Sequence, residues 1–157
     1  MCIIRHTLSK VDERSRMRPY FAYGSNMDLE QMSARCSGAT PLATAVLAAH
    51  RFVINSEGVA TVVSDPLLCV HGLLWSLTEQ HESDLDEYEG VAEGIYRKEN
   101  RSVLAASGQR VEALIYVATD CTEGPAQPGY FDRIVAAAAR LAFPLEYQRE
   151  LGKWLPK

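Results

Sequence analysis

The chain lacks a membrane-spanning segment and an excess of basic residues. No apolar run approaches the roughly 18 residues that a transmembrane helix needs. Lys and Arg together number 16 against 20 Asp and Glu, which gives a net charge of −4. Nucleic-acid binding draws most of its affinity from clustered Lys and Arg facing phosphates. We therefore expect a soluble protein whose partners are neither membranes nor nucleic acids.

Cysteine is scarce, and histidine shows no pattern. The four cysteines have no C-x-x-C spacing, and a chain of 157 residues does not depend on disulfides for its core. We expect free thiols in a reducing cytosol, and hence a cytoplasmic location. The four histidines form no H-E-x-x-H or similar spacing, so we expect no metal site. The residues concerned are Cys2, Cys36, Cys69 and Cys121, and His6, His50, His71 and His81.

A serine nucleophile is not indicated either. Ser25 lies in a Gly-Ser-Asn sequence without the surrounding G-x-S-x-G motif that exposes a nucleophilic serine. In such turns the hydroxyl more often bonds its own backbone. Any chemistry therefore has to come from other residues.

What the chain does have is the composition of one folded domain. A length of 157 residues and a hydrophobic fraction of 47% suit a single core. Residues 1–18 are polar and rich in Arg and Lys, with Asp12 and Glu13 interrupting any transit-peptide character. We predict an N-terminal extension of unknown role over residues 1–18 and a single domain over residues 19–157.

The apolar pattern predicts strands first and the longer helices later. Strands are expected over residues 20–23, 43–54, 59–63 and 70–77, followed by a hairpin of residues 95–104 and 111–118. Helices are expected over residues 27–35 and 79–89, along the face Tyr130, Ile134, Ala137, Ala138 and Leu141, and over residues 145–151. We therefore predict an α+β fold, a small mixed β-barrel with flanking helices.

Local signals frame the predicted helix over residues 79–89. Thr78 has the side chain of an N-cap, and Gly90 is placed as a C-cap glycine. We expect Leu85 and Tyr88 to point inward. Gly72, inside the preceding strand, indicates a bulge or a close approach of another backbone.

Two features together point to chemistry. The aromatic strand Tyr20–Tyr23 runs into a Gly24-Ser25-Asn26 turn, where a residue without Cβ lets backbone N–H groups converge into a small anion cradle. Glu89 is a lone carboxylate at the end of an acidic helix. An anion cradle and one acid suffice for an intramolecular acyl transfer, because the substrate supplies its own nucleophile.

Five segments, in this order, resemble the γ-glutamylcyclotransferase family of the AIG2-like superfamily. They are YFAYGSNM at 20–27, GVATVVSDP at 58–66, VHGLLWSL at 70–77, DLDEYEGVAEGIY at 84–96 and PGYFDRIVAAAARLAFPLEYQREL at 128–151. The resemblance extends from about Pro19 to about Leu151. It implies the family's small β-barrel with packed helices, and a homodimer.

The resemblance also implies a reaction. The α-amine of a small γ-glutamyl substrate attacks its own γ-carbonyl, which releases 5-oxoproline and a free amine without a cofactor. Glu89, at the position of the family's catalytic acid, would move the protons. A helix C-terminus and the neighbouring acids Asp84, Asp86 and Glu87 are expected to raise the pKa of Glu89.

The remaining site residues follow from the same resemblance. The strand and turn would bind the substrate's α-carboxylate through backbone N–H groups and the side chains of Ser25 and Asn26. Tyr116 has a competing role as a structural tyrosine, since it lies within an apolar strand. The substrate-binding residues implied are Tyr20, Phe21, Ala22, Tyr23, Gly24, Ser25, Asn26, Tyr96, Tyr116 and Tyr130.

Three functions stay open at this point. The first is a γ-glutamylcyclotransferase that acts on γ-glutamyl-amino acids. The second is cleavage of a γ-glutamylamine, or removal of a γ-glutamyl group from a biosynthetic intermediate. The third is a non-catalytic ligand-binding domain of the same fold, against which the presence of Glu89 weighs.

Overall fold

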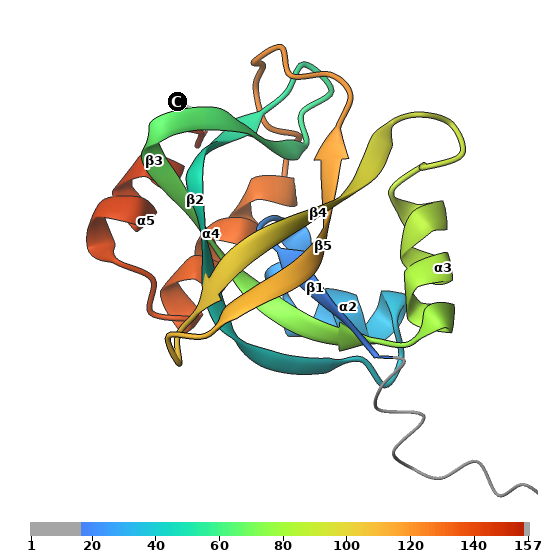
Figure 1. Cartoon of the computed structure of the whole chain (residues 1–157). Helices are drawn as coiled ribbons and strands as arrows, with labels where there is room; N and C mark the ends of the chain where they lie inside the picture. The colour runs from blue at the N-terminus through green and yellow to red at the C-terminus, as the bar shows by residue number, and fades with distance from the viewer. Residues whose placement is uncertain (1–16, 156–157) are drawn as a thin grey trace, which may run out of the picture.

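The structure is a computed structural model that describes residues 17–155 (Figure 1). Its strands are β1 (Arg18–Ala22), β2 (Thr40–Ile54), β3 (Ala60–Leu77), β4 (Tyr96–Ala105) and β5 (Arg110–Ala118). They form a closed barrel in the order β1-β3-β2-β4-β5. β1 pairs antiparallel with β3 and parallel with β5, and the parallel contact closes the barrel.

Helices cover the barrel from several sides. They are a 3₁₀ turn η1 (Ser25–Met27), α2 (Leu29–Arg35), α3 (Glu79–Tyr88), α4 (Tyr130–Arg140) and α5 (Leu145–Gly152). α3 lies on one side of the barrel and α4 and α5 on the other (Figure 1). The predicted α+β class, a small barrel with flanking helices, is confirmed.

The prediction of separate strands over residues 59–63 and 70–77 is wrong, because the chain continues through both as β3. Ser64 of β3 opposes His50 of β2, and Cys69 opposes Ala48. In the pairing of these two described strands, residues 65–68 have no counterpart on β2. The strand therefore bulges out at residues 65–68 and then continues. Pro66 lies within this bulge, where its lack of a backbone N–H breaks no hydrogen bond to β2.

Gly72 lies where β3 closely approaches β1. A Cβ at Gly72 would lie 2.5 Å from the carbonyl oxygen of Ala22 and 2.6 Å from the ring of Phe21. Only glycine fits at such distances. The predicted close approach is confirmed, and it fixes the end of β1 from which the Gly24 turn departs.

α3 begins and ends as its sequence predicts, but one side chain points the other way. Thr78 caps its first turn and Gly90 follows it with a φ of 63°. Leu85 is buried, as expected. Tyr88 is 59% exposed, so its predicted inward orientation is wrong. Its ring instead lies 4.9 Å from the guanidinium of Arg35, a cation–π contact that holds it away from the core.

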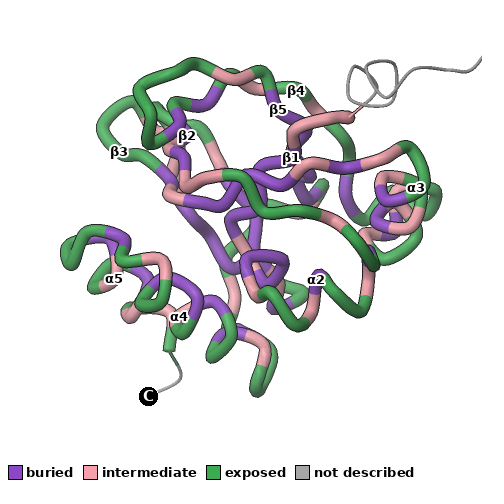
Figure 2. Tube along the Cα trace, turned by 90° about the horizontal axis from the view of Figure 1, so that it is seen from below, coloured by how far each residue is buried: buried purple, intermediate pink, exposed green. Residues whose placement is uncertain are grey.

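One core joins the barrel to the C-terminal helices. Buried residues follow the inner faces of the strands and one side of α4 (Figure 2). Phe131 of α4 stacks at a tilt on Phe52 of β2, with 6.1 Å between ring centroids. α4 also contacts η1, so the same helix that completes the core supports the turn after β1.

Most of the predicted N-terminal extension, with Cys2 and His6, lies outside the described residues. Arg18, the last residue of that range, already belongs to β1. It bonds Glu82 of α3 and Asn100 of β4. In the part of the chain that the structure describes, no helix combines the length and apolar character needed to cross a membrane.

Candidate active site

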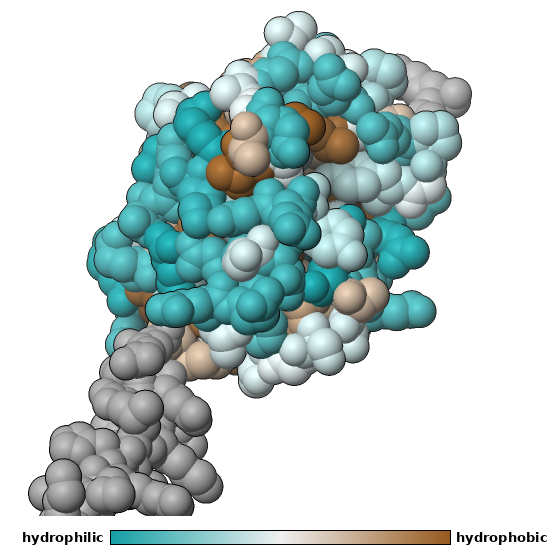
Figure 3. Space-filling model, turned by 90° about the vertical axis from the view of Figure 1, so that its right-hand side faces the viewer, coloured by the Kyte–Doolittle hydropathy of each residue, from teal (hydrophilic) through white to brown (hydrophobic). Residues whose placement is uncertain are grey.

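A cavity of about 590 Å³ opens at one end of the barrel. The turn after β1, the C-terminal end of α3, the β2–β3 loop and the loop after β5 contribute its lining. The side of the molecule that carries α3 has a largely hydrophilic surface (Figure 3). The predicted site residues that line the cavity are Tyr20, Tyr23, Gly24, Ser25, Asn26, Glu89, Tyr96, Tyr116 and Tyr130.

The way α3 ends places Glu89 in this cavity. Glu89 is the C-cap residue, and its N–H still bonds the carbonyl oxygen of Leu85 at 2.8 Å. Gly90 then adopts a left-handed conformation, where a Cβ would lie 2.8 Å from the side chain of Ile95. The chain reverses direction at Gly90, and the carboxylate of Glu89 is left facing the cavity.

Asn26 connects Glu89 to the rest of the site. Its Nδ2 donates to Oε1 of Glu89 at 3.1 Å and to the hydroxyl oxygen of Tyr20 at 3.0 Å. Its Oδ1 accepts a hydrogen bond of 2.9 Å from Arg35. Both N–H bonds of the side-chain amide that we expected to reach the substrate are therefore used in holding Glu89 and Tyr20, and its oxygen binds Arg35.

Burial raises the pKa of Glu89 above its ordinary value. The guanidinium of Arg35 and the hydrogen bond from Asn26 act in the opposite sense and moderate the rise. Oε2 of Glu89 has no hydrogen-bond partner among residues 17–155. The carboxyl group is thus held at one oxygen and free at the other, with its proton affinity increased.

The direction of this pKa shift agrees with the prediction, but the predicted cause is wrong. Burial dominates, rather than the neighbouring acids Asp84, Asp86 and Glu87. Asp86 forms an ion pair of 3.0 Å with Lys98, which compensates its charge. An acid near in sequence affects a pKa only where its charge faces the group.

The turn after β1 brings Gly24 and Ser25 to the cavity wall. η1 begins at Ser25, and the first N–H groups of a helical turn have no intrahelical acceptor. Gly24 has a φ of −112°, so glycine is not required here for its backbone conformation. The space beside it is narrow, because a Cβ would lie 3.3 Å from Cβ of Ala60, which would have to shift slightly, and 3.5 Å from the hydroxyl oxygen of Tyr130.

Tyr96 and Tyr130 bond the backbone of Ala60 in opposite senses. Tyr96 donates to the carbonyl oxygen of Ala60 at 2.5 Å, so its phenolic oxygen remains an acceptor. Tyr130 accepts from the N–H of Ala60 at 3.1 Å, so its own proton remains available to donate. Burial raises the pKa of both phenols, which keeps them protonated at neutral pH.

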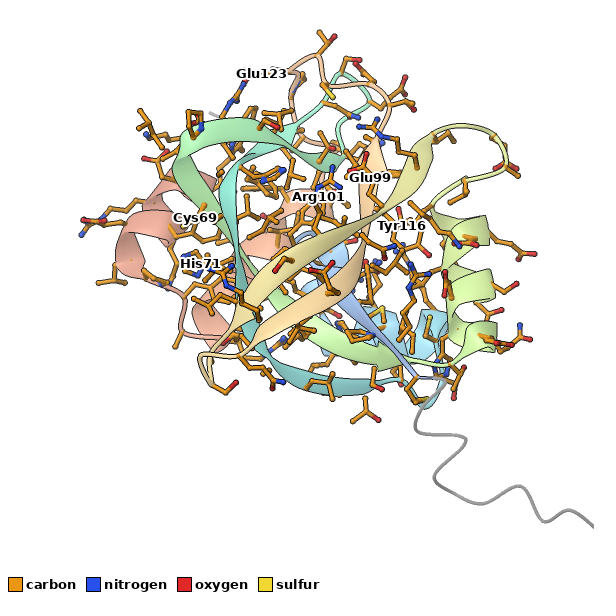
Figure 4. All side chains as sticks on the ribbon, viewed as in Figure 1. Cys69, His71, Glu99, Arg101, Tyr116 and Glu123 are labelled. Carbon is orange, nitrogen blue, oxygen red and sulfur yellow. The ribbon has the colours of Figure 1, made fainter. Side chains whose placement is uncertain are left out.

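Tyr116 has a structural contact as well as a cavity contact. Its ring meets that of Tyr20 edge-on, with 5.6 Å between centroids. Its hydroxyl donates to Asp86 of α3 at 2.7 Å, across the space between β5 and α3 (Figure 4). Tyr116 therefore ties the barrel to the helix that carries Glu89, and its hydroxyl is already engaged.

Phe21 and Ala22 do not line the cavity, although the resemblance placed them in the site. Phe21 is fully buried, and its ring packs at 6.4 Å from that of Tyr23. Ala22 pairs with Leu73 of β3. Both residues are buried in the strand that leads to the Gly24 turn, and their side chains point to opposite faces of β1. They position that strand by packing on both of its faces.

Several polar residues of the cavity were missed by sequence reasoning. Arg35 ends α2, where a basic residue is ordinary because it favours the helix dipole. Tyr88 ends α3, where its helical position suggested a core contact. The others lie in loops whose lengths and compositions carry no motif. The missed residues are Arg35, Asn55, Glu57, Tyr88, Thr119, Asp120 and Gln127.

Metal-ligating side chains are dispersed in the described part of the chain. Among residues 17–155 no three His, Cys, Asp or Glu side chains are grouped closely enough to hold a metal ion. The described cysteines are free thiols, Cys36 buried and Cys69 and Cys121 exposed.

Comparison with known proteins gives consistent similarities. Residues 69–151 match the AIG2-like family. A Homo sapiens protein named gamma-glutamylcyclotransferase is 31% identical over 150 residues, covering 89% of this chain and 79% of the relative. The Bos taurus protein of that name is 29% identical over 147 residues, covering 87% and 78%. A solved structure named gamma-glutamyl cyclotransferase is 29% identical with a TM-score of 0.83, covering 90% of this chain and 89% of that one.

Proposed function

The chain is an enzyme that belongs to the AIG2-like family together with these γ-glutamylcyclotransferases, and we propose that it cleaves a γ-glutamyl amide to 5-oxoproline and a free amine. The observation that carries this proposal is the position of Glu89. Its carboxylate lines a cavity beside the Gly24 turn, is fixed at one oxygen by Asn26, and has a raised pKa.

The substrate would enter with its α-carboxylate at the Gly24 turn. Backbone N–H groups at the start of η1 suit an anion, and Gly24 leaves it room. The α-amine would then lie near Glu89 and the phenolic oxygen of Tyr96, which can still accept a hydrogen bond. The proton of Tyr130 is available for an oxygen of the substrate. This arrangement folds the glutamyl chain so that its amine approaches its own γ-carbonyl carbon.

Glu89 accounts for the protons. The α-ammonium loses two protons as it becomes the lactam N–H, and the leaving nitrogen gains two as it becomes an ammonium ion. The new C–N bond closes a five-membered ring and the amide C–N bond breaks, so no enzyme nucleophile is needed. A carboxyl group with a raised pKa accepts a proton and returns it near neutral pH more readily than an ordinary glutamate.

Two further features stay predictions. The family resemblance implies a homodimer, and the free thiols favour a cytoplasmic location. Gel filtration with light scattering would measure the oligomeric state, which the proposed chemistry does not depend on.

The proposal is tested by incubating the purified chain with a panel of γ-glutamyl amides and measuring 5-oxoproline by mass spectrometry. The panel should contain γ-glutamyl-amino acids and γ-glutamylamines, each beside its α-glutamyl isomer. We expect release from γ-linked compounds alone, because an α-linked isomer cannot close the same ring. Glutamate as the product in place of 5-oxoproline would show hydrolysis and contradict the proposal.

A further inference from the structure

The outer wall of the active-site cavity is acidic. Glu57 in the β2–β3 loop and Asp120 in the loop after β5 both line the cavity, and we call this pair the acidic rim. The other charged lining residues, Glu89 and Arg35, are both bonded to Asn26 in the turn after β1. Their charges balance one another. The two negative charges of the acidic rim are therefore in excess.

The acidic rim is held in a fixed frame. Asn55 Nδ2 donates to the carbonyl oxygen of Asp120 at 3.0 Å, and the hydroxyl of Ser56 donates to the Asp120 carboxylate. Gln127 Nε2 donates to the carbonyl oxygen of Glu57 at 2.8 Å. These bonds join the two loops to each other. A wall that is already ordered spends little entropy on binding a ligand.

The charges of the acidic rim are not neutralised within the described chain. Hydrogen bonds from the Ser56 hydroxyl and the backbone N–H of Thr122 hold the pKa of Asp120 below its ordinary value. Neither Glu57 nor Asp120 forms an ion pair with any of residues 17–155. Arg51 of β2 forms its ion pair with Glu123 instead, with 2.8 Å between Nη1 and Oε1.

The proposed reaction decides which part of the substrate meets the acidic rim. The α-carboxylate and the α-amine are needed at the Gly24 turn and at Glu89, which together form the inner site. The leaving amine is attached at the other end of the glutamyl chain, so its substituent extends to the outer wall. Glu57 and Asp120 therefore attract or repel the substituent according to its charge.

We propose that the acidic rim selects γ-glutamyl substrates whose leaving amine carries a second, positively charged group, and disfavours leaving groups that carry a carboxylate. This inference rests on the proposed function and names its substrate class. Opposite charges across a binding site favour the matching ligand, and like charges exclude the wrong one. Since both acids are near solvent, salt weakens the preference.

Three substrates of equal length isolate the effect of charge. They are the γ-glutamyl amides of butane-1,4-diamine, butylamine and 4-aminobutanoate, whose far ends are positive, neutral and negative at pH 7. We expect kcat/KM to fall in that order, with several-fold steps at low ionic strength. These steps should shrink in 0.5 M salt, where the screening length falls to about 4 Å. Equal values, or the anion as best substrate, would overturn the inference.

Variants assign the preference to named residues. In the double variant Glu57→Gln with Asp120→Asn, the three values of kcat/KM should converge, because the two negative charges that distinguish the substrates are gone. Glu123→Gln is the matched control, because Glu123 lies in the same loop but does not line the cavity (Figure 4). It should keep the wild-type order. A double variant that keeps that order would also overturn the inference.

The two proposals fail in different ways. If the neutral butylamide releases 5-oxoproline but charge makes no difference, the proposed function stands and the acidic rim is not a selector. If none of the three amides releases 5-oxoproline but a γ-glutamyl-amino acid does, the proposed function stands and this inference is wrong. If no γ-glutamyl amide of either kind releases 5-oxoproline, and calorimetry detects no binding of them to Glu89→Gln, both are wrong.

Discussion

Nδ2 of Asn26 lies 3.1 Å from Oε1 of Glu89. The same nitrogen lies 3.0 Å from the hydroxyl oxygen of Tyr20, so one amide joins the turn after β1 to the end of α3. Asn26 is itself held by Trp75, whose Nε1 donates to the Asn26 carbonyl oxygen at 3.1 Å. The orientation of the proposed acid–base residue is therefore set by a turn that lies far from it in the sequence.

Asn26→Ala should move the pH dependence of the reaction. The Asn26 hydrogen bond stabilises the ionised carboxylate and lowers the pKa of Glu89, so its loss raises that pKa further. We expect the acidic limb of the kcat/KM profile to shift to higher pH and kcat to fall roughly ten-fold, the usual scale of a hydrogen bond to a charged group. Asn100→Ala, on the outside of β4, is the control. If kcat falls but the acidic limb of the kcat/KM profile does not move, the hydrogen bond from Asn26 does not affect the pKa of Glu89.

Arg35→Gln should shift the same limb in the same direction. The guanidinium lowers the pKa of Glu89, so a neutral side chain lets burial raise it further. The exposed Arg133→Gln removes an equal charge from α4 and should leave the profile unchanged. If the acidic limb of Arg35→Gln moves to lower pH, the charge of Arg35 does not act on Glu89.

Gly24→Val should weaken substrate binding without unfolding the chain. The added side chain would enter the narrow space between Ala60 and Tyr130 that the α-carboxylate is proposed to share. We expect KM to rise at least ten-fold and the melting temperature to change by only a few degrees. Gly152→Val, where a Cβ meets nothing within 4 Å, is the control. A normal KM for Gly24→Val would show that the turn is only structural.

Gly72→Ala should act on stability instead. Its Cβ would overlap the Ala22 carbonyl and the Phe21 ring, and both belong to the packed barrel wall. Overpacking of this kind costs about 1–3 kcal/mol of unfolding free energy. Urea unfolding measures it, with Gly152→Ala as the reference. A loss of unfolding free energy below about 0.5 kcal/mol, on the scale of ordinary surface substitutions, would mean that β1 can shift to accommodate the added Cβ.

The parts of the fold that depend on local signals were predictable. Thr78 and Gly90 frame α3 because capping depends on a few adjacent residues. The hairpin of β4 and β5 follows from two β-rich runs around a short turn. The continuity of β3 was not predictable, since it depends on pairing with β2 across a bulge that no local pattern reveals.

The same distinction applies to the cavity. The Gly24 turn and Glu89 were found through the resemblance to a family, and the structure brings them to one cavity. Arg35 and the acidic rim were not found, because their roles depend on which loops meet in space. Tyr88 was misplaced for a related reason: its helical position suits the core, but its ring lies over the guanidinium of Arg35 at the cavity wall.

The most direct test of the central claim is the rate of 5-oxoproline release by Glu89→Gln, measured beside Glu87→Gln as a control acid on the exposed side of α3. The account predicts that Glu89→Gln lowers kcat by roughly 10²–10⁴-fold, the range for loss of a positioned acid–base group. Its melting temperature should not fall, since burial opposes the ionised form of Glu89. Near-normal turnover by a folded Glu89→Gln enzyme would contradict the account.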